Sequence, residues 1–320
     1  MLENKKFSII IPAYNAEKFI ERSINSVLSQ RYSNYEVIVI DDGSIDNTVK
    51  VVEQYDSNVV KLLKQNNSGV SGARSKGISF ANGDFICFLD ADDIYYDNHL
   101  STLNDMISEF PEDNFFITGY RNILLSGNTE DVFVNYSDRK CHKEFDFFAT
   151  VSNHGVFYNT NCICIRNSVF QKVGVFQIGV AQGEDTDMWY RVGAYNSVII
   201  SPCITNARYR DFSVATKQRV FTYDWIFEKR LDDILNDVQV PTQRKNSLLK
   251  DMEDRKISKI RHKLLESKRK DAYLILKSIN RNLVSTKRLV STIACFFVPN
   301  IILLNLINRR DAGYYEDKKS

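Results

Sequence analysis

The stretch that decides the fold is FICFLDADD, residues 85–93. Five apolar residues of strand-like sequence lead directly into the carboxylates of Asp90, Asp92 and Asp93. Because side chains alternate along an extended backbone, Asp90 and Asp92 are expected on one face. Two like charges at the end of a buried strand repel each other, and a cation between them and an anionic ligand would stabilise them. For an isolated Asp-x-Asp, the commoner explanation is a polar turn in which Asp93 is the N-cap of a following helix.

Strand-like and helix-like segments alternate through the first half of the chain. Apolar, β-branched runs predict strands, and apolar residues at helical spacing predict helices. The predicted strands are residues 7–11, 35–40, 59–63 and 85–89, and the predicted helices are residues 15–30, 44–55 and 72–81. Asn15 is the expected N-cap of the first helix, and Ser44 or Asp46 caps the second. This alternation is typical of a parallel sheet flanked by helices.

The pattern changes beyond residue 115, where the loops become longer. Further strands are expected at residues 115–119, 131–136 and 162–165, and the acidic stretch 183–191 is expected to begin a helix. From about residue 217 the chain is predicted to be helical.

Polar clusters follow each of the four strands predicted in the first half. They are residues 12–15, 41–44, 65–74 and 90–93. In open α/β sheets, ligands bind at the carboxyl ends of the strands. We therefore expect the four clusters to converge on one edge of the sheet and to form a binding site.

The residues of these clusters suit a nucleoside diphosphate. Tyr14 offers a ring that can stack on a base, and the carboxylate of Asp42 can accept a hydrogen bond from a uracil N–H. Arg74 can pair with a phosphate or a base edge. Asp90 or Asp92 can hold Mg²⁺ or Mn²⁺, which completes its shell with water and phosphate oxygens. Each residue alone also has a structural explanation, and their combination at successive strand ends favours the site.

Common phosphate-binding and nucleophile motifs are absent from the sequence. Pro12-Ala13-Tyr14-Asn15 stands where a dinucleotide fold would place Gly-x-Gly-x-x-Gly. The chain has neither a Gly-Lys-Ser/Thr loop nor a Gly-x-Ser-x-Gly elbow. These absences argue against a dinucleotide enzyme, a P-loop enzyme and a serine hydrolase.

Four segments together resemble the signature of glycosyltransferase family 2. They are residues 7–15, 37–44, 67–74 and 90–93, and the resemblance extends over residues 5–215. It implies the GT-A, nucleotide-diphospho-sugar transferase fold, which is α/β with a mostly parallel central sheet. It also implies an inverting transferase that uses a nucleotide-activated sugar, often linked to UDP, and a divalent metal.

The resemblance assigns roles to residues by their positions in the motifs. Pro12, Tyr14 and Asp42 match positions that contact the nucleotide, as does Arg74. Asp90 matches the carboxylate on the ribose side, and Asp92 matches the metal ligand.

The pair Glu184-Asp185 matches the acidic motif of the family. Its second member, Asp185, is the implied general base, and Glu184 is expected near the acceptor or the donor sugar. Asp187 is the competing candidate for the base. Its alternative role is structural, because a carboxylate in the first turn of a helix is stabilised by the helix dipole. Arg210, with Arg208, is expected near the diphosphate.

Two departures from the family pattern are present. Ser75 follows the Ala-Arg pair, where the family often has Asn. No Gln-x-x-Arg-Trp occurs, so the processive polysaccharide synthases are a poor match.

Composition indicates a soluble globular protein, with 43% hydrophobic and 26% charged residues among 320. The first six residues are short and polar, so no signal peptide is expected. None of the six cysteines forms a CxxC pair. Buried free thiols and a reducing cytoplasm are therefore expected.

The net charge of +2 is unevenly distributed. Residues 1–216 carry 19 Lys and Arg against 27 Asp and Glu, whereas residues 217–320 carry 23 against 13. Residues 289–307 contain no charge and lie between basic pairs. Polar residues and a proline interrupt this segment, which argues against a clean membrane span. A pair of helices on an anionic membrane surface is the preferred interpretation; packing on the protein itself or on a twin subunit, as in a homodimer, is the alternative.

These inferences combine into one prediction. Residues 1–216 form a GT-A catalytic domain, with a nucleotide-binding half (1–115) and an acceptor half (116–216), and residues 217–320 form a helical basic and apolar tail. The protein is expected to be a cytoplasmic glycosyltransferase, peripheral on the inner face of the cell membrane. It would add one sugar to a glycan or lipid-linked acceptor in polysaccharide synthesis, with no nucleic-acid partner. The alternatives are a nucleotidyltransferase and a non-catalytic sugar-nucleotide binder or scaffold.

Overall fold

The structure, a computed structural model, describes residues 5–138, 140–180, 183–210 and 226–298. The chain divides into two compact units, residues 1–241 and 242–320. The predicted boundary at residues 216 and 217 lies outside the described residues.

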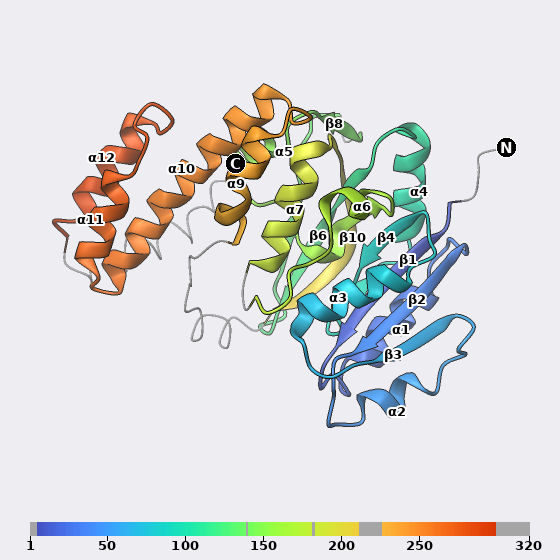
Figure 1. The fold of residues 1–320 in the computed structure, drawn as a ribbon. Coiled ribbons are helices and arrows are strands. Elements are labelled where there is room, and N and C mark those ends of the chain that lie inside the picture. Colours follow the sequence, from blue (N-terminus) through green and yellow to red (C-terminus); the bar gives the residue numbers. More distant parts are fainter. Residues whose placement is uncertain (1–4, 139, 181–182, 211–225, 299–320) are drawn as a thin grey trace. The chain divides into compact units, whose positions relative to one another are not determined.

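The first unit is built on one mixed sheet (Figure 1). Its strands are β1 (Phe7–Ala13), β2 (Tyr35–Asp41), β3 (Val60–Lys64), β4 (Phe85–Phe88), β5 (Ile94–Tyr95), β6 (Phe115–Leu124), β7 (Thr129–Val132), β8 (His142–Glu144), β9 (Ile163–Arg166) and β10 (Val198–Arg210). The order along the sheet is β3-β2-β1-β4-β9-β6-β10-β5, with β7 beside β6 and β8 beside β10. Strands β3, β2, β1 and β4 are parallel to one another, as are β6 and β10, while β9 runs antiparallel to β4 and β6. The prediction of an α/β fold with a mostly parallel central sheet is confirmed along this path.

Helices connect and cover these strands. They are α1 (Ile20–Leu28), α2 (Thr48–Val52), α3 (Gly69–Phe80), α4 (His99–Glu109), α5 (Phe147–His154), α6 (Val169–Val173), α7 (Glu184–Tyr195) and α9 (Leu231–Asn236), with 3₁₀ turns η1 (Thr160–Cys162) and η2 (Ile226–Arg230). The predicted strands of the first half are all present, and α3 and α7 lie where helices were expected.

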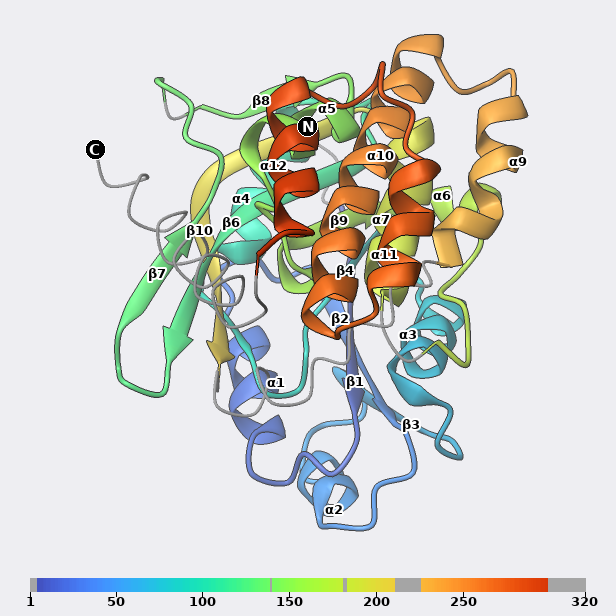
Figure 2. The ribbon, with the colours of Figure 1, turned by 90° about the vertical axis from the view of Figure 1, so that its left-hand side faces the viewer.

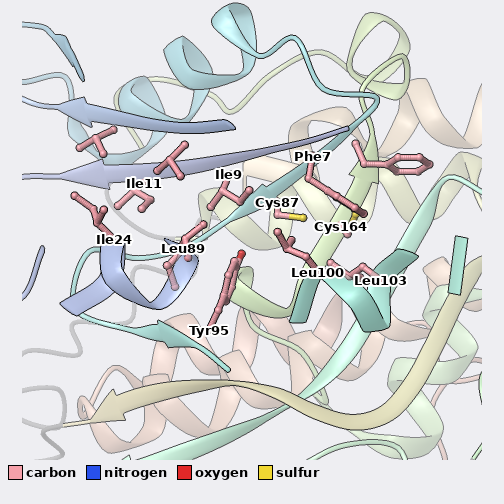
Figure 3. Packing of buried hydrophobic residues seen from close by; sticks show 14 of the residues in the cluster. Phe7, Ile9, Ile11, Ile24, Cys87, Leu89, Tyr95, Leu100, Leu103 and Cys164 are labelled. Atoms are coloured by element: carbon pink, nitrogen blue, oxygen red, sulfur yellow. The ribbon is translucent and has the colours of Figure 1, made fainter. Parts of the chain in front are cut away.

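Alternation along β1 sends its side chains to two different layers. Ile9 and Ile11 belong to the core cluster that includes Ile24 of α1 and residues of α4 (Figure 3). Ile10 points the other way, toward Gly77 of α3, where an added Cβ would stand 2.4 Å from Ile10 Cγ2. Helices α1 and α3 therefore cover opposite faces of the sheet, as Figure 2 shows.

Two predicted helix caps are wrong. The first helix starts at Ile20 rather than near Asn15, whose backbone has a φ of 49° and whose Oδ1 accepts the N–H of Ile45 at 2.9 Å. Asp93 precedes strand β5 instead of a helix, and α4 begins only at His99. The polar side chain predicted to cap a helix instead accepts a hydrogen bond from a distant residue in both places, Ile45 for Asn15 and Tyr209 for Asp93.

The second unit contains α10 (Thr242–Leu265), α11 (Arg269–Lys277) and α12 (Thr286–Cys295). Its small core is formed by Ile257, Ile260, Leu264, Ala272, Ile279 and Val284. Among the helices that the structure describes, none has the length and apolar character needed to cross a membrane. Residues 299–307 of the uncharged segment lie outside the described part of the chain.

Candidate active site

The carboxyl ends of β1, β2 and β3 are joined by main-chain hydrogen bonds. The N–H of Asp42 donates to the carbonyl of Ala13 at 2.8 Å, and the N–H of Gln65 donates to the carbonyl of Asp41 at 2.9 Å. The loops that follow three successive strands therefore meet at one edge, as the sequence predicted.

Asp42 is buried and held in position by the loop after β3. Its Oδ1 accepts from Gln65 Nε2 at 2.7 Å and from the main-chain N–H of Ser68 at 2.9 Å. Tyr14, which follows β1, is 52% exposed, so its ring is open to a ligand. Pro12 is buried within β1.

Arg74 connects two carboxylates that are far apart in the sequence. Its Nη2 donates to Asp90 Oδ1 at 2.7 Å, and its Nη1 donates to Glu184 Oε1 at 3.2 Å. The side chain is buried, and although burial favours the neutral form, the charges of Asp90, Glu184 and Asp185 raise the pKa of Arg74. The structure thus brings together the strand end of β4, helix α3 and the start of α7.

The three carboxylates after β4 have different surroundings. Asp90 is partly buried, Asp92 is exposed and Asp93 is buried. Loss of hydration and the charge of Asp90 raise the pKa of Asp92, while Arg208 and Arg22 oppose this shift. Burial and the charges of Asp90 and Asp92 raise the pKa of Asp93 to about 8. The turn therefore concentrates negative charge, which is the condition that attracts a cation.

Helix α1 holds the main chain of this turn. Ser23 Oγ lies 2.7 Å from the carbonyl oxygen of Ala91 and 2.6 Å from that of Asp93. Arg22 Nη2 donates to the carbonyl of Asp92 at 2.5 Å, and its guanidinium lies 3.7 Å from the ring centre of Tyr209. Sequence patterns gave no indication of Arg22 or Ser23, because these contacts span about 70 residues.

Asp93 connects the turn to strand β10. Its Oδ1 accepts the main-chain N–H of Tyr209 at 2.8 Å, and its Oδ2 accepts from Asn161 Nδ2 at 2.6 Å. This is the tertiary role that replaces the predicted helix cap. Arg208 and Arg210 flank Tyr209 at the end of β10, and both are partly buried.

The first turn of α7 contains Glu184, Asp185 and Asp187, where the helix dipole stabilises negative charge. Asp185 is partly buried, and its Oδ1 accepts the N–H of Thr186 at 2.6 Å. Burial and the charge of Asp185 raise the pKa of Glu184, and Arg74 opposes this shift.

Asp187 differs from its neighbours because it is 1% exposed. Its Oδ2 lies 2.8 Å from Arg191 Nη2, and its Oδ1 lies 3.7 Å from Arg230 Nε. These contacts give Asp187 a structural role.

Ser75, the departure from the family pattern, also has a partner. Its hydroxyl donates to the carbonyl of Phe176 at 3.0 Å, in a buried contact. This bond joins α3 to the segment before α7, beside the bridge that Arg74 makes.

The donor set at the turn suits a hard divalent cation. Asp90 and Asp92 supply carboxylate oxygens, which Mg²⁺ and Mn²⁺ prefer. Within the described residues, no group of three or more acidic, histidine or cysteine side chains is placed to enclose a metal. A cation held by Asp92 would complete its shell with phosphate oxygens and water.

Comparison with known proteins gives the family. Residues 8–172, more than half of the chain, match the model of "Glycosyl transferase family 2". The chain belongs to this family. Family members with the GT-A fold commonly use a divalent metal.

Two curated relatives extend the comparison. An "Uncharacterized glycosyltransferase RP339" of Rickettsia prowazekii is 27% identical over 215 residues, which are 67% of this chain and 63% of the relative. The "UDP-Glc:alpha-D-GlcNAc-diphosphoundecaprenol beta-1,3-glucosyltransferase WfgD" of Escherichia coli is 50% identical over 94 residues, which are 29% of this chain and 37% of the relative. The chain thus spans less than two thirds of the length of either relative.

A solved structure confirms the GT-A fold. The structure of S. aureus TarS 1–349 in complex with UDP-GlcNAc matches with a TM-score of 0.62 and 21% identity. The match covers 78% of this chain and 72% of the TarS chain.

Proposed function

We propose that this protein is an inverting, metal-dependent glycosyltransferase that moves one sugar from a nucleotide-sugar to a glycan acceptor. The observation that carries the proposal is the Arg74 bridge between Asp90 and Glu184. It links the carboxylates expected to hold the donor to the acidic pair expected to meet the acceptor. This contact supports a transfer site in which one guanidinium joins a donor-side carboxylate to an acceptor-side carboxylate.

The donor is proposed to lie along the carboxyl ends of β1 to β4. Tyr14 stacks on the base, and Asp42, already fixed by Gln65 and Ser68, accepts a base N–H. Asp90 faces the ribose, and Asp92 holds the cation at the diphosphate. Arg74 acts chiefly by holding Asp90, because its two terminal nitrogens are occupied by carboxylates.

Asp185 is proposed to be the general base. The acceptor hydroxyl attacks the anomeric carbon in line, its proton passes to the Asp185 carboxylate, and the bond from that carbon to the diphosphate oxygen breaks. The electron pair leaves with the nucleoside diphosphate, whose charge a bound cation would stabilise. Asp187 is unsuitable for this role because it is buried against Arg191. Arg208 and Arg210 would offer positive charge near the leaving group.

The relatives suggest the substrate class. The matched TarS structure contains UDP-GlcNAc, and the name of WfgD specifies UDP-Glc and a diphosphoundecaprenol-linked sugar. We therefore propose a UDP-hexose donor and a lipid-diphosphate-linked acceptor in the assembly of a bacterial surface polysaccharide. Residues 1–216 would form the catalytic domain.

The second unit is proposed to bind an anionic membrane surface. Tyr273 and Leu274 of α11, and Val290 and Ile293 of α12, are exposed apolar residues. Residues 244–288 carry 15 Lys and Arg against 5 Asp and Glu. Exposed apolar side chains among basic ones suit the inner face of a cell membrane, where headgroups are anionic.

The proposal can be tested with the full chain, Mn²⁺ and a panel of UDP-sugars on undecaprenyl-diphosphate-linked acceptors. Released UDP and a product of inverted anomeric configuration are expected. Released pyrophosphate would indicate a nucleotidyltransferase, and UDP binding without turnover of any sugar would indicate a binder. Flotation with phosphatidylglycerol vesicles, but not with phosphatidylcholine vesicles, would support the membrane role; flotation with neither would contradict it.

A further inference from the structure

Asn161 contacts both ends of the Asp90–Asp93 turn, which are also joined by a main-chain hydrogen bond from the N–H of Asp93 to the carbonyl of Asp90 at 3.0 Å. It is 1% exposed and belongs to η1, which immediately precedes β9. Its Oδ1 accepts the main-chain N–H of Asp90 at 2.9 Å, and its Nδ2 donates to Asp93 Oδ2 at 2.6 Å. A single amide group thus fixes the first residue of the turn and the carboxylate of the last.

The position of Asn161 is itself fixed. Asn159 Oδ1 accepts the N–H of Asn161 at 2.7 Å, and Cys162 Sγ accepts the N–H of Asn159 at 3.2 Å. Strand β9 then pairs with β4, with Cys164 opposite Cys87. The amide is therefore held at the end of the strand that delivers Asp90 and Asp92.

The chemistry of an amide suits this place. Asp93 is 2% exposed, so its side-chain oxygens need hydrogen-bond partners within the protein. A lysine or arginine would supply them, but its charge would also cancel the negative potential of the turn. Asparagine satisfies Asp93 and the Asp90 N–H without adding a charge.

We propose that Asn161 is a positioning residue that sets the Asp90 carboxylate for the ribose and the Asp92 carboxylate for the cation at the diphosphate. The inference rests on the proposed function, because it assumes that a metal-bound nucleotide-sugar occupies this edge of the sheet. Groups that orient metal ligands typically contribute about 10- to 100-fold to metal affinity. Asn161 acts through the turn and does not need to touch the substrate.

Asn167 provides a matched control at the opposite end of the same strand pair. Its Nδ2 donates to the carbonyls of Gly83 at 3.0 Å and Ala81 at 3.4 Å, just before β4. Asn161→Ala and Asn167→Ala therefore both remove an asparagine that ties a residue beside β9 to a residue beside β4. Only Asn161 lies at the end where Asp90 and Asp92 stand.

The experiment measures the Mn²⁺ concentration that half-saturates the protein with UDP present, by electron paramagnetic resonance of free Mn²⁺, beside thermal unfolding. Asn161→Ala and Asn161→Leu are expected to raise this concentration at least 10-fold. Asn161→Leu retains the size and adds no charge but removes both the donor and the acceptor, so it tests the inference even if the alanine variant does not fold. Asn167→Ala is expected to leave the Mn²⁺ requirement within about twofold of wild type, whatever its unfolding temperature.

Two results would overturn the inference. One is a wild-type Mn²⁺ requirement in folded Asn161 variants, and the other is an equal increase in Asn161→Ala and Asn167→Ala. If the wild-type protein binds neither UDP nor Mn²⁺, the proposed function fails instead, and the wild-type arm alone reveals this.

Discussion

Two carboxylates at opposite ends of the parallel strands, Glu36 and Asp92, have opposite surroundings. At the amino end, Glu36 is 4% exposed and accepts from Ser8 Oγ, Lys61 Nζ and the N–H of Asn82, each at 2.7 Å. At the carboxyl end, Asp92 is exposed and its pKa is raised by lost hydration and by Asp90. The protein neutralises the charge of Glu36, whereas the Asp92 carboxylate remains accessible to a ligand.

This difference separates stability from function along the same strands. Burial opposes the charge of Glu36, but hydrogen bonds from Lys61, Ser8 and Asn82 lower its pKa to about 2. Such a group stabilises the folded state when it is ionised. Asp92 has a raised pKa, so its ionised form destabilises the folded state. A bound cation would remove this destabilisation. Substitutions at the two ends should therefore affect different measurements.

The largest effect is expected at the proposed base. Asp185→Asn should reduce the rate of sugar transfer by about 10²- to 10⁴-fold, because proton removal loses its acceptor, while the unfolding free energy stays close to wild type. Steady-state assays of UDP release, with circular dichroism of the same samples, measure both quantities.

Asp187→Asn is the control on the same helix turn. Because Asp187 is buried against Arg191, its neutralisation should lower the unfolding free energy by about 3 to 5 kcal/mol and leave turnover per folded molecule nearly intact. If Asp187→Asn abolished transfer in the folded protein and Asp185→Asn did not, the two roles would have to be exchanged.

Asp92→Asn should weaken the binding of UDP in the presence of Mn²⁺ and slow transfer by about 100-fold, since cation stabilisation of a leaving diphosphate contributes several kcal/mol. Calorimetric titration with and without chelator checks this. Asp97→Asn is the matched control, because Asp97 is exposed and its Oδ2 lies 2.8 Å from Arg31 Nη2. Transfer that survives exhaustive chelation would contradict the metal role of Asp92.

Glu36→Gln tests the amino end of the strands. Since the pKa of Glu36 is lowered from 4.5 to about 2, its stabilisation is present above about pH 4.5 and is lost as the pH falls toward 2. Wild type should lose about 1 to 3 kcal/mol over that range, with screening by water at the half-exposed Lys61 included.

In Glu36→Gln this pH dependence should be absent, and transfer per folded molecule should be unchanged. Urea unfolding at several pH values measures the difference. Glu53→Gln, which removes an exposed pair with Lys64, should change stability by less than about 0.5 kcal/mol. A Glu36→Gln variant with wild-type pH dependence would show that the network at this end does not stabilise the fold.

The smallest effect is expected at Tyr14. Tyr14→Ala should weaken UDP binding about 3- to 10-fold, because one stacked ring contributes on the order of 1 kcal/mol. Tyr273→Ala removes an equally exposed tyrosine of the second unit and should leave UDP affinity unchanged. Equal affinities for all three proteins would remove Tyr14 from the proposed base site.

The sequence was sufficient to place the polar clusters that directly follow a strand. The four clusters after β1 to β4 could be placed because a parallel sheet brings its carboxyl ends together, and the structure confirms this arrangement. The roles proposed for the residues in those clusters remain predictions.

The residues that hold the site could not be predicted. Asn161 reaches Asp93 across 68 residues and Tyr209 reaches it across 116, and neither belongs to a recognisable motif. The long strand β10 was missed because its apolar residues do not alternate regularly, and its pairing with β6 contains bulges. Asp93 was assigned to a helix cap because the residues next to it in the sequence give no information about its tertiary partners, Asn161 and Tyr209.

Gly77 lies at the contact between helix α3 and strand β1. Its lack of a Cβ allows α3 to lie against Ile10, and Arg74 precedes it by three residues on the same face of the helix. The close approach of α3 to β1 at Gly77 thus lies one helical turn from the residue whose guanidinium reaches Asp90. A bulkier residue at position 77 would move the helix away from the sheet, and the ion pair at the strand ends would be strained by an apolar clash beneath it.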